Sequence, residues 1–165
     1  MPAEAAATAT CFSCANTALL PDLPPRESVA LDEHWRVAHA VGVGLLGWLV
    51  LVPRRHVTTI AELTDEEAAA LGGWQVRLSR ALSEVTGCVK TYLAQFSEAP
   101  GFSHLHFHLV PRPAELDPQL LGPGVFTLID NPAHPAPEPA AMDAFARRLR
   151  ACLDRNQNSG ARPWG

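Results

Sequence analysis

The sequence predicts an α+β fold built around a mainly antiparallel sheet. Apolar segments of strand length lie on both sides of one long amphipathic segment, and a second amphipathic segment lies near the end of the chain. Helices do not alternate strictly with strands, which disfavours a parallel sheet with helices on both faces. The 165 residues suit one domain with tails, and a hydrophobic content of 47% is ample for a buried core.

Two strands are expected before the long helix. In residues 34–40, apolar Trp35 and Val37 are set against polar neighbours, as in a strand with one buried face. Residues 48–52 are all apolar and are followed by Pro53, which is typical of a strand buried on both faces.

The long helix is expected over residues 64–87. Thr64 with Glu67 three positions later forms a capping box, which satisfies free amides at a helix N-terminus. Apolar side chains recur at helical spacing: Leu71, Trp74, Leu78, Leu82 and Val85. Gly87 is a residue type that commonly ends a helix.

Two further strands are expected after this helix. Residues 88–96 alternate between apolar and polar side chains, and residues 103–110 do so more clearly. Pro111 and Pro113 are expected to end the second of these strands, because proline has no N–H to donate to a sheet.

The last third of the chain is rich in proline and contains a predicted helix. Residues 111–139 hold eight of the 15 prolines, and residues 124–130 form the one expected strand among them. Residues 138–157 place apolar side chains on one helical face. We therefore expect three parts: a disordered arm over 1–10, a domain over 11–130, and a Pro-rich segment, helix and tail over 131–165.

Composition argues mildly against several classes of partner. A net charge of −4 and a pI near 5.9 argue against non-specific binding to nucleic acid or to a membrane surface. The sequence has no apolar run of membrane-spanning length, and its first ten residues lack the basic start of a secretory signal. We expect a cytoplasmic protein whose four cysteines are reduced.

His104, His106 and His108 occupy alternate positions in "SHLHFHLVPR". In a strand, such residues share one face at steps of roughly 6.6 Å, and the apolar residues between them face the core. Three imidazoles on one face favour a functional role. Two chemistries remain open: a catalytic metal bound by three histidines, or an imidazole nucleophile with a partner.

Cys11 and Cys14 form a Cys-x-x-Cys motif. In a reducing compartment this motif favours a metal site over a disulfide, and a redox role would need a strand before it and a helix after it, neither of which is evident. A closed structural zinc site needs two more ligands. The candidates by residue type are His34, His39, His56, His104, His134 and Cys88.

Four segments resemble the histidine triad (HIT) superfamily. "HLHFHLV" (104–110) matches the family signature His-apolar-His-apolar-His-apolar-apolar at every position. "GWLVLVPRRHV" (47–57) resembles the family segment Gly-His-Thr-Leu-Val-x-Pro-x-x-His, and "AELTDEEAAAL" (61–71) resembles the helix start after it. "CFSC" (11–14) resembles the Cys-x-x-Cys of the zinc-containing bacterial branch. The similarity spans residues 11–113 in the family's order.

The resemblance implies a HIT-like fold: a five-stranded antiparallel sheet with one long helix and a C-terminal helix, assembled as a homodimer. It implies a nucleotide hydrolase or nucleotidyl transferase that acts on a nucleotide or a dinucleoside polyphosphate-like molecule. His106 would attack the α-phosphate to form a covalent nucleotidyl-histidine. His108 would contact the phosphate and help to protonate the leaving group. Cys11, Cys14, His56 and His104 would hold a structural zinc.

Three positions depart from the family pattern. Trp48 stands where a histidine often supports the triad, Pro100 where a glutamine contacts phosphate, and Leu93 where an asparagine does. Other residues are candidates to contact the substrate instead: Ser97, Ser103 and Arg112. Hydrolysis of phosphoric esters or phosphoramidates is therefore one expectation, and a nucleotide-binding protein with little or no catalysis is the alternative.

Overall fold

We describe residues 11–158 of a computed structural model. The strands are β1 (Ala30–Leu31), β2 (Trp35–His39), β3 (Leu49–Pro53), β4 (Lys90–Ala94) and β5 (Phe107–Arg112). The helices are α2 (Phe12–Ala18), α3 (Asp65–Thr86) and α4 (Pro139–Asn158), with short 3-10 helices η1 (Pro25–Glu27), η2 (Ile60–Glu62), η3 (Pro118–Leu120) and η4 (Gly122–Leu128). The disordered arm expected over 1–10, and the tail after residue 158, lie outside the described residues.

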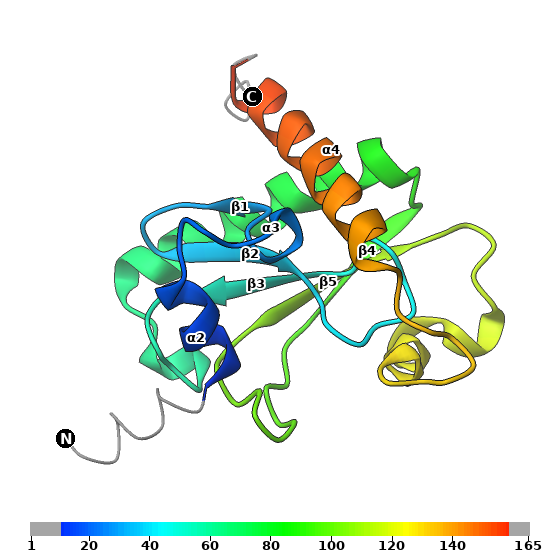
Figure 1. The fold of residues 1–165 in the computed structure, drawn as a ribbon, viewed down its shortest axis with the longest axis horizontal. Helices are drawn as coiled ribbons and strands as arrows, with labels where there is room; N and C mark the ends of the chain where they lie inside the picture. The colour runs from blue at the N-terminus through cyan, green and yellow to red at the C-terminus, as the bar shows by residue number, and fades with distance from the viewer. Residues whose placement is uncertain (1–10, 159–165) are drawn as a thin grey trace.

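The five strands form one sheet in the order β1-β2-β3-β5-β4, and every neighbouring pair is antiparallel (Figure 1). This confirms the predicted α+β fold. The long α3 connects β3 to β4, so that β5 inserts between the two strands that flank this helix in the sequence. Within residues 11–158, no helix combines the length and the apolar composition that a bilayer crossing requires.

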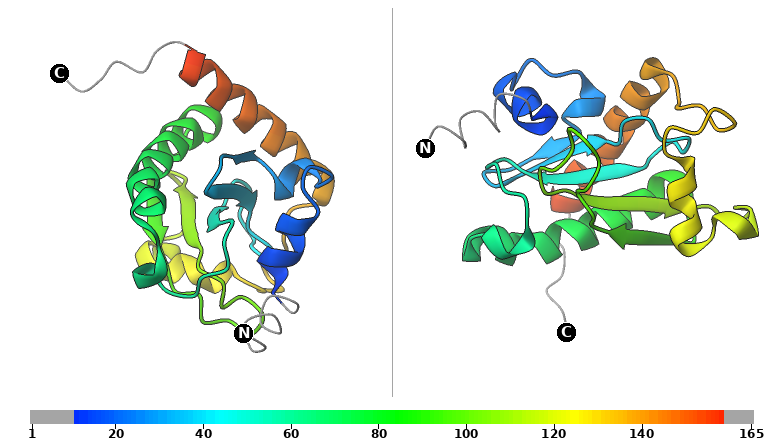
Figure 2. Two further views of the ribbon diagram at one scale, coloured as in Figure 1. Left: turned by 90° about the vertical axis from the view of Figure 1, so that its left-hand side faces the viewer. Right: turned by 90° about the horizontal axis from the view of Figure 1, so that it is seen from below.

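The two faces of the sheet differ in what covers them. Helices α3 and α4 lie on one face, while α2 lies on the other (Figure 2). The main core fills the α3/α4 face, where Trp35, Leu51 and Leu109 are fully buried against α3 and α4 side chains. The apolar residues between the triad histidines, Leu105 and Phe107 among them, point into this core as predicted. The histidines are thereby directed to the opposite face.

Helix α3 follows the sequence closely. Thr64 is its N-cap: the Thr64 hydroxyl accepts from the Glu67 amide, and the Glu67 carboxylate accepts from the Thr64 amide, which completes the predicted capping box. Gly87 is the C-cap in the left-handed region, with φ of +70°, a conformation that glycine adopts without steric cost. The predicted helix at 138–157 is confirmed as α4.

The predicted strand over residues 124–130 is wrong. These residues belong mainly to η4, and only Ile129 forms an isolated bridge, to Val43. Val125 and Leu128 are spaced by three, which places both on one side of a 3-10 helix, where they are buried against the outer face of the sheet. The fifth strand is instead the two-residue β1, which is too short to be predicted from alternation.

Three local expectations also fail. The strand expected over residues 103–110 begins only at Phe107, so His104 and His106 precede β5 and His108 alone of the three lies in it. Pro111 does not end the triad strand but lies within β5, where it pairs with Thr91 of β4. Pairing of β5 with β3 has already stopped at Leu109, so the missing N–H interrupts no ladder on that side. A helix, α2, follows directly after Cys11, although seven residues of mixed polarity gave no helical pattern.

Candidate functional site

A cavity of about 440 Å³ opens on the face of the sheet opposite α3 and α4. Its floor follows the strand register: Ala38 of β2 pairs with Val50 of β3, which pairs with His108 of β5. His106 and His108 line the cavity on the β5 side, and Arg36 lines it from β2, across β3. The remaining walls are mainly apolar and come from α2, from the loop before the triad and from the residues after η4: Phe12, Ala99, Pro100, Phe102 and Ile129.

A second cluster lies beside this cavity and contains Cys11, Cys14, His56 and His104. One ligand atom from each residue lies within 4.8 Å of all the others. The Cys14 sulfur is 3.3 Å from Nδ1 of His56 and 3.5 Å from Nδ1 of His104, and the Cys11 sulfur is 3.4 Å from Nδ1 of His104. These are the four residues that the family resemblance implied.

The cluster fits a tetrahedral zinc ion. Bonds of about 2.3 Å to sulfur and about 2.1 Å to nitrogen put neighbouring sulfur and nitrogen ligands roughly 3.5 Å apart, close to the three sulfur–nitrogen distances above. Nε2 of His104 is 2.9 Å from the carbonyl oxygen of Pro53, so this nitrogen donates and Nδ1 keeps its lone pair for a metal. Burial lowers the pKa of His104 to about 4, which keeps the ring neutral.

Helix α2 positions the two cysteines. Cys11 is its N-cap, and the Cys11 sulfur accepts from the Cys14 amide at 3.5 Å. The first turn of the helix therefore turns both sulfurs toward the histidines. Burial, and then the adjacent Cys11 thiol, raise the pKa of Cys14 to about 11, so protons compete with a metal for this sulfur.

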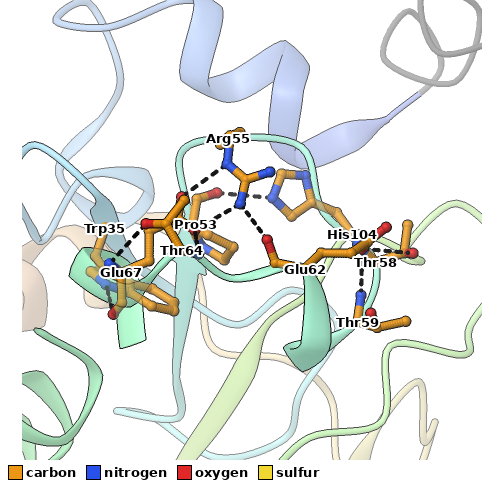
Figure 3. A network of polar contacts seen from close by, with 9 residues as sticks. All are labelled: Trp35, Pro53, Arg55, Thr58, Thr59, Glu62, Thr64, Glu67 and His104. Carbon is orange, nitrogen blue, oxygen red and sulfur yellow. Dashed lines mark hydrogen bonds and ion pairs between the residues drawn. The ribbon is translucent and has the colours of Figure 1, made fainter. Parts of the chain in front are cut away.

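A polar network holds the segment between β3 and α3, which carries His56 (Figure 3). Arg55 donates through Nε and Nη2 to the carboxylate of Glu67, at 3.1 and 2.8 Å, and through Nη2 to the carbonyl of Glu62. The carboxylate of Glu62 accepts from the Thr58 and Thr59 amides. The segment is thus tied to the N-terminus of α3 before His56 and to η2 after it.

His106 has a defined tautomer. Its Nδ1 is 2.8 Å from the carbonyl oxygen of His104, and a carbonyl only accepts, so Nδ1 carries the hydrogen. Nε2 is left with a free lone pair, the form in which an imidazole acts as a nucleophile. The His106 ring is partly exposed at the cavity.

His108 has the opposite tautomer. Nε1 of Trp48 donates to Nδ1 of His108 at 3.0 Å, and an indole N–H is a donor only. The neutral His108 ring therefore carries its hydrogen on Nε2. Burial, and then the charge of His106, lower the pKa of His108 to about 4. The His106 and His108 rings lie edge to face, with centroids 4.8 Å apart.

Trp48 is itself fixed on two sides. Gly47, with φ of +90°, donates its amide to Nε2 of the buried His39, and His39 donates through Nδ1 to the Ala40 carbonyl. Phe126 of η4 packs edge to face on Trp48 and on His108, each with centroids 5.3 Å apart. Sequence analysis could not identify Phe126 as a site residue, because a strand was expected over its segment.

The three residues predicted to contact the substrate lie in different places. The Ser97 hydroxyl accepts from the His106 amide at 3.2 Å and from Gln95 at 3.0 Å, beneath the His106 ring. Ser103 is exposed, and Arg112 donates to the carbonyls of Pro113 and Ala114 at the far end of β5. None of the three lines the cavity. Their contact with a substrate stays a prediction.

No protein-family model matches the chain, and no curated protein does so either. Solved structures do match. A Zn-bound histidine triad family protein from Mycobacterium smegmatis superposes with a TM-score of 0.69 at 19% identity, over 93% of this chain and 99% of that one. The chain has the histidine triad fold.

Two further structures agree. A hypothetical histidine triad nucleotide-binding protein from Sulfolobus tokodaii strain7 gives a TM-score of 0.67 at 16% identity, over 92% of this chain and 100% of that one. A histidine triad protein from Bradyrhizobium japonicum gives 0.62 at 26% identity, over 76% and 89%. The resemblance to the histidine triad superfamily is confirmed, and the four-ligand cluster is compatible with zinc.

The Arg55–Glu67 network of this histidine triad fold predicts a pH-dependent stability. The hydrogen bonds from Arg55, above all, lower the pKa of the buried Glu67. A lowered pKa stabilises the folded state above the unfolded-state pKa of about 4.3, and the effect is lost as pH falls through the folded value. Glu67→Gln should lower the free energy of unfolding by about 1–2 kcal/mol at pH 7.

Urea unfolding at pH 7 and near pH 3 measures this effect. The difference between Glu67→Gln and the wild-type protein should shrink at the lower pH, because the Glu67 carboxylate of the wild-type protein takes up a proton as the pH falls. Glu115→Gln, at an exposed carboxylate, is the matched control. Equal destabilisation at both values would mean that packing, and not the ion pair, is responsible.

Proposed function

We propose that this protein binds a nucleotide in the cavity and that His106 attacks its α-phosphorus. The observation that carries the proposal is the pair of opposite tautomers: a free Nε2 lone pair on His106 stands beside an Nε2–H donor on His108. The first supplies a nucleophile, and the second supplies a hydrogen bond to a phosphate oxygen. The nucleotide-binding description of the Sulfolobus tokodaii neighbour supports a nucleotide as the ligand.

The steps balance without proton transfer from His106. Its Nε2 forms the bond to phosphorus while the bond to the leaving group breaks, and the electron pair departs with that group. The phosphorylated ring is cationic and keeps its Nδ1–H on the His104 carbonyl. Water or another acceptor then attacks phosphorus and releases its proton to the solvent, and the electron pair of the broken P–N bond returns to Nε2.

The other end of the cavity suits a base. Arg36 is buried and makes one hydrogen bond, from Nη1 to the Glu27 carbonyl, whereas a guanidinium has five N–H donors. Its Nε is buried with no partner among the described residues. The Glu27 carboxylate lies 3.9 Å from Nη1 of Arg36, so this end is close to neutral and offers both donors and an acceptor. Apolar Val50 and Val52 lie between it and the histidines.

One observation favours the alternative of nucleotide binding with little catalysis. Pro100 lines the cavity where a side-chain donor would face the phosphate, and Arg36 is the only Lys or Arg among the cavity residues of the described chain. Few donors therefore stabilise charge on the phosphate oxygens. Hydrolase activity, a homodimeric assembly and a cytoplasmic location remain predictions.

We also propose that the four-ligand cluster holds a structural zinc. Its ligands come from the start of α2, from the segment after β3 and from the segment just before β5. A bound ion would therefore join three parts of the chain. Zinc would supply cross-linking and no reactive water, because four protein ligands close the site. The Zn-bound Mycobacterium smegmatis neighbour supports this choice of metal.

Turnover and intermediate trapping test the catalytic proposal. Incubation with a panel of dinucleoside polyphosphates should give mononucleotide products, and acid-free quenching should give a protein mass increased by one nucleotidyl group. His106→Ala should lose the adduct and lower kcat by roughly 10³-fold or more. His134→Ala, at an exposed histidine, is the matched control. Nucleotide binding by calorimetry without product or adduct would support the scaffold alternative instead.

Metal analysis tests the zinc proposal. The purified protein should contain one zinc per chain, and Cys11→Ser or His56→Ala should lose it. Chelation should lower Tm by roughly 10 °C, because binding energy contributes directly to folding. His106→Ala should retain the metal. Retention of zinc in Cys11→Ser with loss in His106→Ala would instead indicate the three-histidine catalytic site.

A further inference from the structure

The contact between Trp48 and His108 limits what His108 does in a reaction. The indole N–H donates at 3.0 Å, both side chains are buried, and the two rings meet edge to face. We propose that Trp48 holds His108 as a hydrogen-bond donor that cannot act as an acid, so that the site selects substrates whose leaving group departs as a stable anion. This inference rests on the proposed function and names its substrate class.

The argument begins with the charged form of His108. An imidazolium carries hydrogen on both ring nitrogens. The hydrogen on Nδ1 would then face the indole hydrogen of Trp48 across a distance that suits one hydrogen bond. Both donors would lose their partner in a buried setting, where an unpaired donor destabilises the structure. Trp48 does not titrate, so it offers no way to relieve this conflict.

No other group near His108 relieves the conflict. The rings that face it within the described chain are Trp48, Phe126 and His106, and of these only His106 titrates. Positive charge on His106, which forms when it carries the nucleotidyl group, opposes a charge on His108. Phe126 covers another side of the ring and offers no acceptor. A neutral His108 is thus favoured at the step when a leaving group needs a proton.

Proton balance then decides the substrate. A neutral His108 that gave up its Nε2 hydrogen would become an imidazolate, which is too basic to form here. It therefore donates a hydrogen bond and keeps its proton. A phosphate or polyphosphate departs with its electron pair and needs no proton. An amine or an alkoxide does need one, so phosphoramidates and alkyl esters should react slowly.

A leaving-group series measures this restriction. Aryl esters of AMP and of GMP, with phenols of graded pKa, vary the leaving group and leave the nucleotide constant. For the wild-type protein, log kcat/KM should fall steeply as the phenol pKa rises. Trp48→Phe removes the N–H and Trp48→His replaces it with a group that accepts, so both should give a shallower slope. The relative gain for the poorest leaving groups should approach the roughly 10²–10⁴-fold that acid catalysis supplies.

Trp74→Phe is the matched control, because Trp74 is also buried and its indole donates to Asp32 at 2.6 Å on the other face of the sheet. Its slope should match that of the wild-type protein. Nitrogen-15 NMR of wild-type His108 should show hydrogen on Nε2 and none on Nδ1 from pH 5 to pH 8, a readout that needs no turnover and no variant.

The outcomes are distinct. A protonated Nδ1, or a wild-type slope as shallow as that of Trp48→Phe, overturns the inference and leaves the proposed function standing. Absence of turnover on every ester and on the dinucleoside polyphosphates, with the predicted tautomer present, overturns the proposed function and with it the substrate restriction.

Discussion

His104 is the residue on which the other parts of the site depend. Its Nδ1 points to the two cysteine sulfurs, its Nε2 donates to the Pro53 carbonyl at the end of β3, and its own carbonyl accepts from His106. One buried residue therefore links the candidate metal site, the sheet and the nucleophile. A change at the metal cluster would reach His106 through a single peptide group, which is how a structural ion influences chemistry that it does not touch.

The three triad histidines are evenly spaced in the sequence, but they differ in their hydrogen-bond partners and in which ring nitrogen carries hydrogen. Each ring has a different partner: a carbonyl and sulfurs for His104, a carbonyl for His106, and an indole for His108. These partners set which nitrogen carries hydrogen, and so they set which ring can bind a metal, attack phosphorus or donate a hydrogen bond. Alternation along a strand does not by itself place the rings, because only His108 lies in β5.

This division explains how far sequence reasoning could go. The period-two pattern predicted that the apolar residues of the triad segment face the core and that His106 and His108 face away from it, and the capping box at Thr64 predicted α3. Both patterns depend on neighbours close in sequence. The motif resemblance added the cysteine and histidine ligands, which lie 42 to 93 positions apart for the contacting pairs. Periodicity alone could not have joined them.

The rest depends on packing between distant segments. A strand was expected over residues 124–130 because their apolar content does not distinguish a strand from a short 3-10 helix. In the structure, this segment packs in one buried cluster with Trp48 and Val110, which are distant in sequence. The same packing brings the indole N–H of Trp48 and the ring of Phe126 against His108. Trp48 stands where the family pattern often has a histidine. Its indole N–H nevertheless donates a hydrogen bond to His108.

The exchange of an imidazole for an indole at position 48 alters both stability and chemistry. An indole buries more apolar surface and gives Phe126 an aromatic partner, so it suits a position covered by a Pro-rich segment. It also removes the one neighbour that could accept hydrogen from Nδ1 of His108. One hydrogen bond, from the Trp48 indole to Nδ1 of His108, therefore both orients the His108 ring and, on our proposal, prevents it from acting as an acid. On the proposed function, such a site would orient a phosphate through the Nε2–H of His108 and would leave protonation of the departing group to the substrate or to water.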